Sequence, residues 1–223
     1  VLSIEGTALN LRGDQIELFV STEKEGIGYP DDISAYQKPG TGVWSIDRVA
    51  AELTGESSLE TALEGAISSG QLEPFLECSD PRFLHVKDPV VHTTTKGDTV
   101  VAFCTHPFNW TSANSGYTVK PAGSDAFGSA KYEFFPRGFT WDVAATRLTS
   151  ILSLPTAVTG VEEALQIAFY DGAECLRLLD ENPMAVKRPR GFSCEELGSA
   201  AWYSGDDIDS IKRLDVHAPI FLS

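Results

Sequence analysis

The sequence is poor in positive charge and has no long apolar run. It holds 17 Lys and Arg residues against 32 Asp and Glu residues, a formal net charge of −15. Because phosphate binding needs a basic surface, this balance argues against a nucleic-acid partner. No apolar stretch approaches the roughly 20 residues of a membrane span, and the first residues lack a signal-peptide pattern. We therefore expect a soluble protein with no membrane partner, either cytoplasmic or secreted. The sequence does not begin with Met, so we do not expect Val1 to be the natural translation start.

Metal and nucleotide motifs are also missing. The four His residues show no metal-ligand spacing, and there is no Gly-rich phosphate loop or nucleophile elbow. We expect no cofactor and no catalytic metal. The cysteines contain no Cys-x-x-Cys pair, which argues against a zinc ribbon. They could form two disulfides, but buried free thiols are favoured. They are Cys78, Cys104, Cys175 and Cys194.

Alternating residues predict a β-hairpin at the start of the chain. Ile16, Leu18 and Val20 alternate with other residues, as in a strand with one buried face. Gly13 lies in an Arg-Gly-Asp turn and tolerates the positive φ that tight hairpins need. Glu5 then lies near the start of the first strand. There it could be a functional carboxylate or a solvated one.

Two further blocks are also rich in strand-forming residues. One spans residues 83–107 with a Thr-Lys-Gly-Asp turn at 95–98, and the other spans 137–172 with breaks at Pro155 and Gly160. The blocks share an acidic residue near a strand start and an apolar strand that ends in small or polar residues. Such repetition is typical of β-propeller blades, and an ordinary β-sandwich fits the periodicity equally well.

One short helix is expected between the first two blocks. Ser57 and Glu60 form a capping-box pattern, and Gly70 is a stop signal. The helix lies in a predicted insertion, residues 52–80, within a single domain spanning 1–223. We assign no chemistry to it. Its apolar face consists of Leu59, Ala62, Leu63, Ala66 and Ile67.

Several of these stretches resemble one enzyme family. "IEGTALNLRGDQIELFVSTE" (4–23), "KDPVV" (87–91), and "TWDVAATRLTSIL" with "AFYDG" (140–152, 168–172) are similar to blades of five-bladed β-propeller glycosidases, which include arabinanases, xylosidases and fructosidases. The resemblance implies an all-β propeller with one inserted helix, acting on an oligo- or polysaccharide. A structural ion at the propeller axis is compatible with it. In the family's order the acid-bearing blade is third, so the chain would hold the C-terminal three blades. An upstream segment or another protomer would then complete the propeller.

The resemblance also assigns candidate catalytic carboxylates. Glycoside hydrolysis needs one protonated acid and one ionised carboxylate beside the sugar. Glu5 matches the general acid, although Thr7 stands where the family pattern has Pro. Asp88 could be the carboxylate that faces the transition state, or it could merely begin a strand before Pro. Asp142 could bind sugar hydroxyls or form a structural ion pair with Arg147.

Other residues could bind the substrate. Asp171 could face a ligand at a strand end or lie in an Asp-Gly turn. Arg147 could help to bind the sugar. Arg188 and Arg190 could bind the carboxylate or sulfate of an anionic sugar, or lie in a solvated loop. Aromatic side chains could stack on a pyranose or belong to the core; they are Trp44, Trp110, Trp141 and Tyr170. The alternative to an enzyme is a non-catalytic carbohydrate-binding or scaffold propeller.

Overall fold

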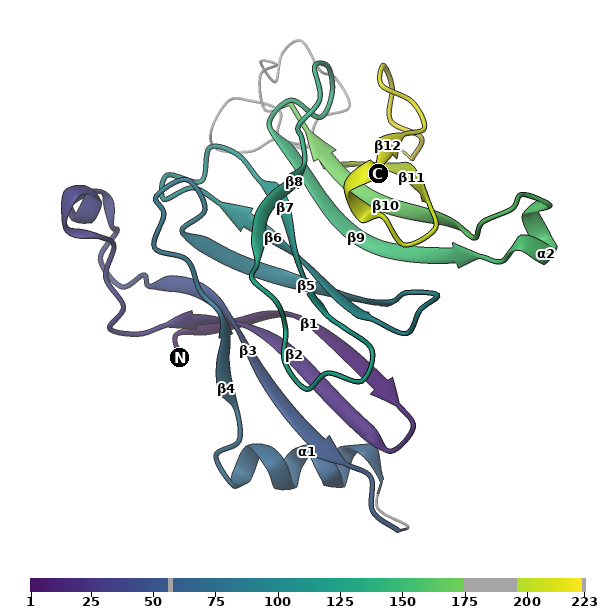
Figure 1. Ribbon diagram of the computed structural model, residues 1–223. Helices are drawn as coiled ribbons and strands as arrows, with labels where there is room; N and C mark the ends of the chain where they lie inside the picture. The colour runs from purple at the N-terminus through teal and green to yellow at the C-terminus, as the bar shows by residue number, and fades with distance from the viewer. Residues whose placement is uncertain (56–57, 175–195, 222–223) are drawn as a thin grey trace. The chain divides into compact units, whose positions relative to one another are not determined.

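The computed structural model describes residues 1–55, 58–174 and 196–221 (Figure 1). Contacts within the chain divide it into two compact units. We call residues 1–91 with 101–110 the first unit, and residues 92–100 with 111–223 the second unit. The described residues form three four-stranded sheets and few helices. The all-β prediction is therefore confirmed, whereas a closed propeller stays a prediction.

The first sheet belongs to the first unit and has the order β1-β2-β3-β4, with every pair antiparallel. Gly13 has a φ of 61° and lies in the two-residue turn that joins β1 to β2, which confirms the predicted hairpin. The short 3-10 helix η1 (Asp31–Tyr36) precedes β3. The strands are β1 (Ser3–Arg12), β2 (Gln15–Lys24), β3 (Val43–Glu52) and β4 (Glu73–Leu76).

The predicted one-sided burial of β2 is wrong. Leu18 and Val20 are only half-buried, whereas Glu17 on the opposite face is buried. A buried carboxylate needs charge and hydrogen-bond partners. Glu17 accepts hydrogen bonds from Arg48 Nη2 of β3 at 2.5 Å and from Asn10 Nδ2 of β1 at 2.7 Å. The two strands that flank β2 therefore each supply a hydrogen-bond partner that stabilises the buried Glu17 carboxylate.

Helix α1 (Leu59–Ser68) lies between β3 and β4 and packs against β3 and β2 (Figure 1). Its N-cap is Ser58, whose Oγ accepts a hydrogen bond from the Thr61 amide at 3.2 Å. Ser57, the predicted cap, lies outside the described residues. The helix stops before Gly70 as expected: Gly70 follows the C-cap Ser69 and has a φ of 79°, and the residue 71 amide donates to the Ala66 carbonyl at 3.1 Å. This is the Schellman pattern that glycine favours.

The second sheet has the order β5-β6-β7-β8. The turn predicted at 95–98 is confirmed by the Gly97 amide, which donates to the Thr94 carbonyl at 3.0 Å. Every residue of β6 is buried, so both of its predicted faces are covered. The strands are β5 (His85–Thr93), β6 (Thr99–His106), β7 (Asn114–Lys120) and β8 (Lys131–Phe135).

The third sheet belongs to the second unit and has the order β12-β11-β10-β9. The break predicted at Pro155 and Gly160 is confirmed: these residues are the N-cap and the left-handed C-cap of the short helix α2 (Thr156–Thr159). The 3-10 helix η3 (Ile208–Ser210) follows β11. The strands are β9 (Ala145–Leu154), β10 (Leu165–Ala173), β11 (Leu197–Ser204) and β12 (Lys212–Arg213).

Two sequence expectations concern the chain as a whole. Within the described residues, no helix has the length and apolarity to cross a membrane. Cys78 and Cys104 are free thiols, and Cys104 is buried as expected, whereas Cys78 is half-buried. Cys175 and Cys194 lie outside the described residues.

Candidate functional site

Strands β1 and β5 of the first unit bring two of the predicted catalytic carboxylates to one lysine. Lys87 Nζ contacts Glu5 Oε2 and lies 3.8 Å from Asp88 Oδ2. The lysine side chain is 14% exposed, whereas those of Glu5 and Asp88 are 48% and 37% exposed. Both acids are therefore accessible to a ligand. We call this group the Glu5–Lys87–Asp88 cluster.

The backbone around Gly6 explains how the strands approach so closely. The register of β1 against β2 shifts between Glu5 and Thr7, and Gly6 at this bulge has a φ of +32°. A Cβ atom on Gly6 would lie 2.7 Å from Asp88 Oδ1. Asp88 is further fixed by its amide, which donates to Ser21 Oγ of β2 at 2.8 Å. Only glycine leaves room for this approach without strain.

Two tryptophan rings border the cluster. Lys87 Nζ lies 5.1 Å from the centroid of the Trp44 ring and 5.9 Å from that of Trp110, within the range of cation–π attraction. Trp44 is buried, whereas Trp110 is 42% exposed. Among the described residues, Asp88 and Trp110 are the two non-glycine residues with positive φ, 55° and 57°. Backbone strain of this kind gathers at functional sites.

A buried histidine, His85, contacts both tryptophan residues. His85 Nδ1 accepts a hydrogen bond from the Trp44 amide at 3.3 Å, and Nε2 lies 3.1 Å from Tyr29 Oη. Its ring stacks on Trp110, with centroids 4.2 Å apart and planes 20° apart. Burial, aided by the charge of Lys87, lowers the pKa of His85 to about 4. The imidazole is therefore neutral at pH 7 and acts as a packing group.

Asp142 belongs to the second unit, whereas the Glu5–Lys87–Asp88 cluster belongs to the first. Asp142 is fully buried, and Arg213 Nε donates to its Oδ2 at 2.6 Å. Its ion-pair partner is thus Arg213 rather than Arg147. Trp141 and Tyr170 are also buried and stack on each other, with centroids 5.6 Å apart. All three have the geometry of core residues.

A second acid–cation–acid group lies in the second unit. Arg147 contacts Glu196, and its Nη2 lies 4.0 Å from Asp171 Oδ2. Burial raises the pKa of Asp171, and Glu196 adds to this while Arg147 opposes it. Asp171 lies within β10 opposite Arg147 of β9, so the Asp-Gly turn considered for it is wrong. Arg188 and Arg190 lie outside the described residues.

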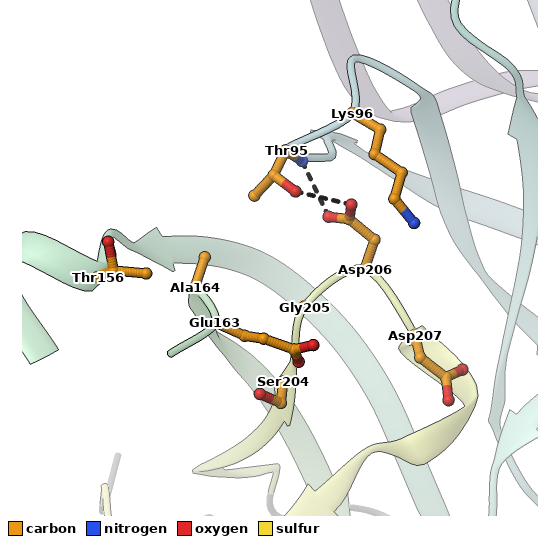
Figure 2. A pocket seen from close by; sticks show the side chains of 9 residues that line it. All are labelled: Thr95, Lys96, Thr156, Glu163, Ala164, Ser204, Gly205, Asp206 and Asp207. Carbon is orange, nitrogen blue, oxygen red and sulfur yellow. Dashed lines mark hydrogen bonds between the residues drawn. The ribbon is translucent and has the colours of Figure 1, made fainter. Parts of the chain in front are cut away.

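The second unit also contains a polar pocket of about 510 Å³ (Figure 2). Asp206 Oδ1 accepts from the Thr95 amide at 2.9 Å, and Oδ2 accepts from Thr95 Oγ1 at 2.7 Å. Burial raises the pKa of Asp206, but the hydrogen bonds from Thr95 and the charge of Lys96 outweigh it, so that the pKa is lowered overall. The lining residues, none of them aromatic, are Thr95, Lys96, Thr156, Glu163, Ala164, Ser204, Gly205, Asp206 and Asp207.

Sequence reasoning named Thr95 and Lys96 only as part of a turn and assigned a function to no residue of this pocket. The one signal was the Gly-Asp-Asp run that follows β11, because such a run is typical of a turn. Reasoning also missed Lys87 and the support that His85 gives to Trp110. For metals, the part of the chain that the structure describes holds no group of three or more His, Cys, Asp or Glu residues suited to an ion.

The sequence matches no protein-family model and no curated protein. Among solved structures, the chain is similar to a glycosyl hydrolase from Bacteroides ovatus, with 11% identity and a TM-score of 0.37 over 98% of this chain and 71% of that one. It is similar to a candidate glycosidase from Bacteroides thetaiotaomicron VPI-5482, with 10% identity and a TM-score of 0.37 over 98% and 74% of the two chains. It is also similar to a candidate glycoside hydrolase from Parabacteroides distasonis ATCC 8503, with 10% identity and a TM-score of 0.38 over 98% and 73%. TM-scores of this size do not establish a shared fold.

Proposed function

We propose that this chain contributes the carbohydrate site of a glycoside hydrolase that acts on an oligo- or polysaccharide. The carrying observation is that Glu5 and Asp88, from separate strands, meet at Lys87 beside the exposed ring of Trp110. Carboxylates accept hydrogen bonds from sugar hydroxyls. An aromatic ring packs against the C–H groups of a sugar face. The cluster therefore offers both kinds of contact that a sugar needs.

In the proposed mechanism, Glu5 is the proton donor and Asp88 is the ionised carboxylate. In the structure the Glu5 carboxyl is in contact with Lys87, whereas a proton donor must face the glycosidic oxygen. We propose that sugar binding draws the Lys87 ammonium towards Asp88, which already lies 3.8 Å away. Glu5 then faces the sugar as the proton donor, and Lys87 pairs with Asp88.

The bond changes follow from these two roles. The Glu5 carboxyl gives its proton to the glycosidic oxygen as the bond between that oxygen and the sugar carbon breaks. Asp88 stabilises the positive charge that develops on the sugar. A water molecule attacks the sugar carbon and loses its proton to a base, which we propose is supplied by another segment of the same protein or by another protomer.

A non-catalytic carbohydrate-binding module is the second candidate. The contact between Glu5 and Lys87 favours it, because a carboxylate paired with an ammonium can still accept hydrogen bonds from sugar hydroxyls, and binding alone needs no proton donor. In this alternative Lys87 stays in place, and the same residues bind the sugar without cleaving it.

The test is Glu5→Gln in the full chain together with the segment or protomer that supplies the base, assayed for reducing ends released from arabinan, xylan and fructan and, separately, for binding. Loss of the proton donor should reduce hydrolysis by about 10²- to 10⁴-fold while binding changes little. The control is Glu60→Gln, which alters an exposed side chain on α1 of the same unit. It should leave both measurements unchanged.

The outcomes separate the two candidates. Hydrolysis that survives Glu5→Gln removes Glu5 as the acid. Binding without any released sugar, by the unaltered chain together with the segment or protomer that supplies the base, supports the binding module instead. Neither binding nor hydrolysis on any of the three polymers would contradict both.

A further inference from the structure

We propose that the outer face of Trp110 is the platform on which a sugar unit stacks in this site, and that this unit is uncharged. The inference rests on the carbohydrate function proposed above. It adds the residue that holds the sugar ring and the class of sugar that the site accepts.

Two residues of β5 contact the Trp110 ring. His85 and Lys87 are two residues apart on β5, so their side chains point to the same side of the sheet. Both contact the Trp110 ring, at 4.2 Å between ring centroids for His85 and 5.9 Å from Nζ for Lys87. Because His85 is buried and Trp110 is 42% exposed, the face of the indole away from His85 is open to a ligand.

A second buried histidine holds the same ring. The His106 ring, from the adjacent strand β6, lies 4.6 Å from the Trp110 ring with planes 43° apart. His106 is itself fixed by Cys104, whose Sγ lies 3.3 Å from His106 Nε2. The indole thus rests on two buried rings, and a rigid aromatic surface loses little entropy when a ligand binds.

The backbone at Trp110 is strained for a bulky side chain. Its φ of 57° lies in the left-handed region that Gly, Asn and Asp favour. A short turn holds the residue there, in which the Trp110 amide donates to the Pro107 carbonyl at 2.9 Å. Strain of this kind persists only where the surroundings impose it, and here the indole lies over His85 and near Lys87.

The charges around the platform set the class of sugar. An approaching sugar meets two carboxyl groups, Glu5 and Asp88, and one ammonium, Lys87, so the formal charge of the cluster is negative until Glu5 carries the proton that it donates. The whole chain, with the cluster included, has a formal charge of −15. A uronate or sulfated sugar stacked on Trp110 would meet this excess of negative charge and be repelled. An uncharged sugar offers hydroxyl donors to both carboxylates without that cost.

The experiment uses the full 223-residue chain and three hexasaccharides, namely xylohexaose, arabinohexaose and hexagalacturonate. Binding is followed by calorimetry and by protection of tryptophan fluorescence from acrylamide. The variants are Trp110→Ala, Trp110→Phe, which keeps an aromatic face should the alanine variant fold poorly, and Trp202→Phe. Trp202 is the matched control, because it too is partly exposed and Lys212 Nζ lies 5.5 Å from the centroid of its ring. It belongs to the second unit.

We expect one of the neutral hexasaccharides to bind, and Trp110→Ala to weaken that binding by about tenfold or more, as at an aromatic hot spot. Trp110→Phe should stay within a few-fold of the unaltered chain, and Trp202→Phe should match it. Hexagalacturonate should bind at least about tenfold more weakly, and added salt should narrow the gap because it screens the repulsion.

Unchanged binding in Trp110→Ala would overturn the platform, and tighter binding of hexagalacturonate would overturn the charge argument. Either result leaves hydrolysis that depends on Glu5 untouched, so these failures are distinct from failure of the proposed function. Absence of binding to all three hexasaccharides, combined with hydrolysis of a polymer, would also reject the platform.

Discussion

At the scale of single residues, Gly6 controls the approach of β1 to Asp88. Its φ is +32°, and an added Cβ atom would lie 2.7 Å from Asp88 Oδ1 and 3.1 Å from Asp88 Cα. Gly6→Ala therefore combines backbone strain with a clash, and we expect it to lower the free energy of unfolding by about 3 kcal/mol. Because the clash pushes Asp88 away from Lys87, sugar binding should fall as well. Urea unfolding and calorimetry measure the two effects.

Gly13→Ala is the control for this substitution. Gly13 also has a positive φ, 61°, but nothing lies within 4 Å of the position of an added Cβ. Gly13→Ala should lower the free energy of unfolding only by the left-handed backbone strain, about 1–2 kcal/mol, and leave sugar binding unchanged. Equal losses of stability in the two variants would show that contact with Asp88 adds nothing at Gly6.

The same scale shows what sequence reasoning could reach at the site. Glu5 and Asp88 were singled out because each lies near an expected strand start, and the structure brings these two together. Lys87 was missed, although it directly precedes Asp88 in the sequence. For Asp142 the sequence left open a sugar hydroxyl or the nearby Arg147 as partner, but its ion-pair partner, Arg213, lies 71 residues away along the chain. Local spacing cannot reveal a partner that only the packing of strands supplies.

At the scale of elements, Asp142 joins the two-residue strand β12 to the segment before β9. Arg213 of β12 donates from Nε to Asp142 Oδ2 at 2.6 Å and from Nη2 to the Pro136 carbonyl at 2.6 Å. Asp142→Asn removes the charge that balances a nearly buried guanidinium. We expect a loss of about 3–5 kcal/mol of unfolding free energy, as is usual when one partner of a buried pair is removed. Hydrogen exchange should also show faster opening of β12.

The control is Asp209→Asn, which breaks an ion pair with Lys131 in the same unit. Both of its side chains are about half-exposed, at 46% and 49%. Exposed pairs contribute at most about 1 kcal/mol, so this variant should remain close to the unaltered protein. A cost for Asp142→Asn no larger than that of the control would mean that the Arg213 pair does not hold β12.

Elements with a local signal could be predicted. The hairpin turns at Gly13 and Gly97, the break at Pro155 and Gly160, and the stop of α1 at Gly70 all depend on backbone preferences that one or two residues determine. The burial of β2 could not be predicted in this way. Its inward face depends on Glu17 meeting Arg48, which comes from β3, 31 residues further along the chain.

At the scale of the whole molecule, composition and the repeated strand blocks were enough to predict an all-β chain. They were not enough to predict whether the sheets form a closed propeller. That arrangement depends on the side chains packed between sheets and not on the period within a strand. The five-bladed arrangement therefore remains a prediction from resemblance, and so does the single domain.

The stability of the whole chain should fall in mild acid. Burial and the charge of Lys87 lower the pKa of His85 to about 4 in the folded protein, against an ordinary value of 6.5. Between these values the unfolded chain binds a proton that the folded chain does not, so the free energy of unfolding falls as the pH drops from about 6.5 to 4. The contribution of this one group is roughly 3 kcal/mol. Below about pH 4, His85 causes no further fall in the free energy of unfolding.

Urea unfolding at several pH values between 7 and 4 measures this effect, with His85→Gln as the test variant. The variant loses the contacts of His85 to Trp44 and Tyr29, so it should be less stable at pH 7, but its stability should depend less steeply on pH. The carboxylates titrate in both proteins, and the difference between the two curves isolates His85. His217→Gln, which changes an exposed histidine and leaves His85 in place, serves as the control. If the unfolding free energies of the unaltered protein and His85→Gln change in parallel with pH, His85 carries the same charge in the folded and unfolded chains. The conclusion that a neutral imidazole stacks on Trp110 would then be wrong.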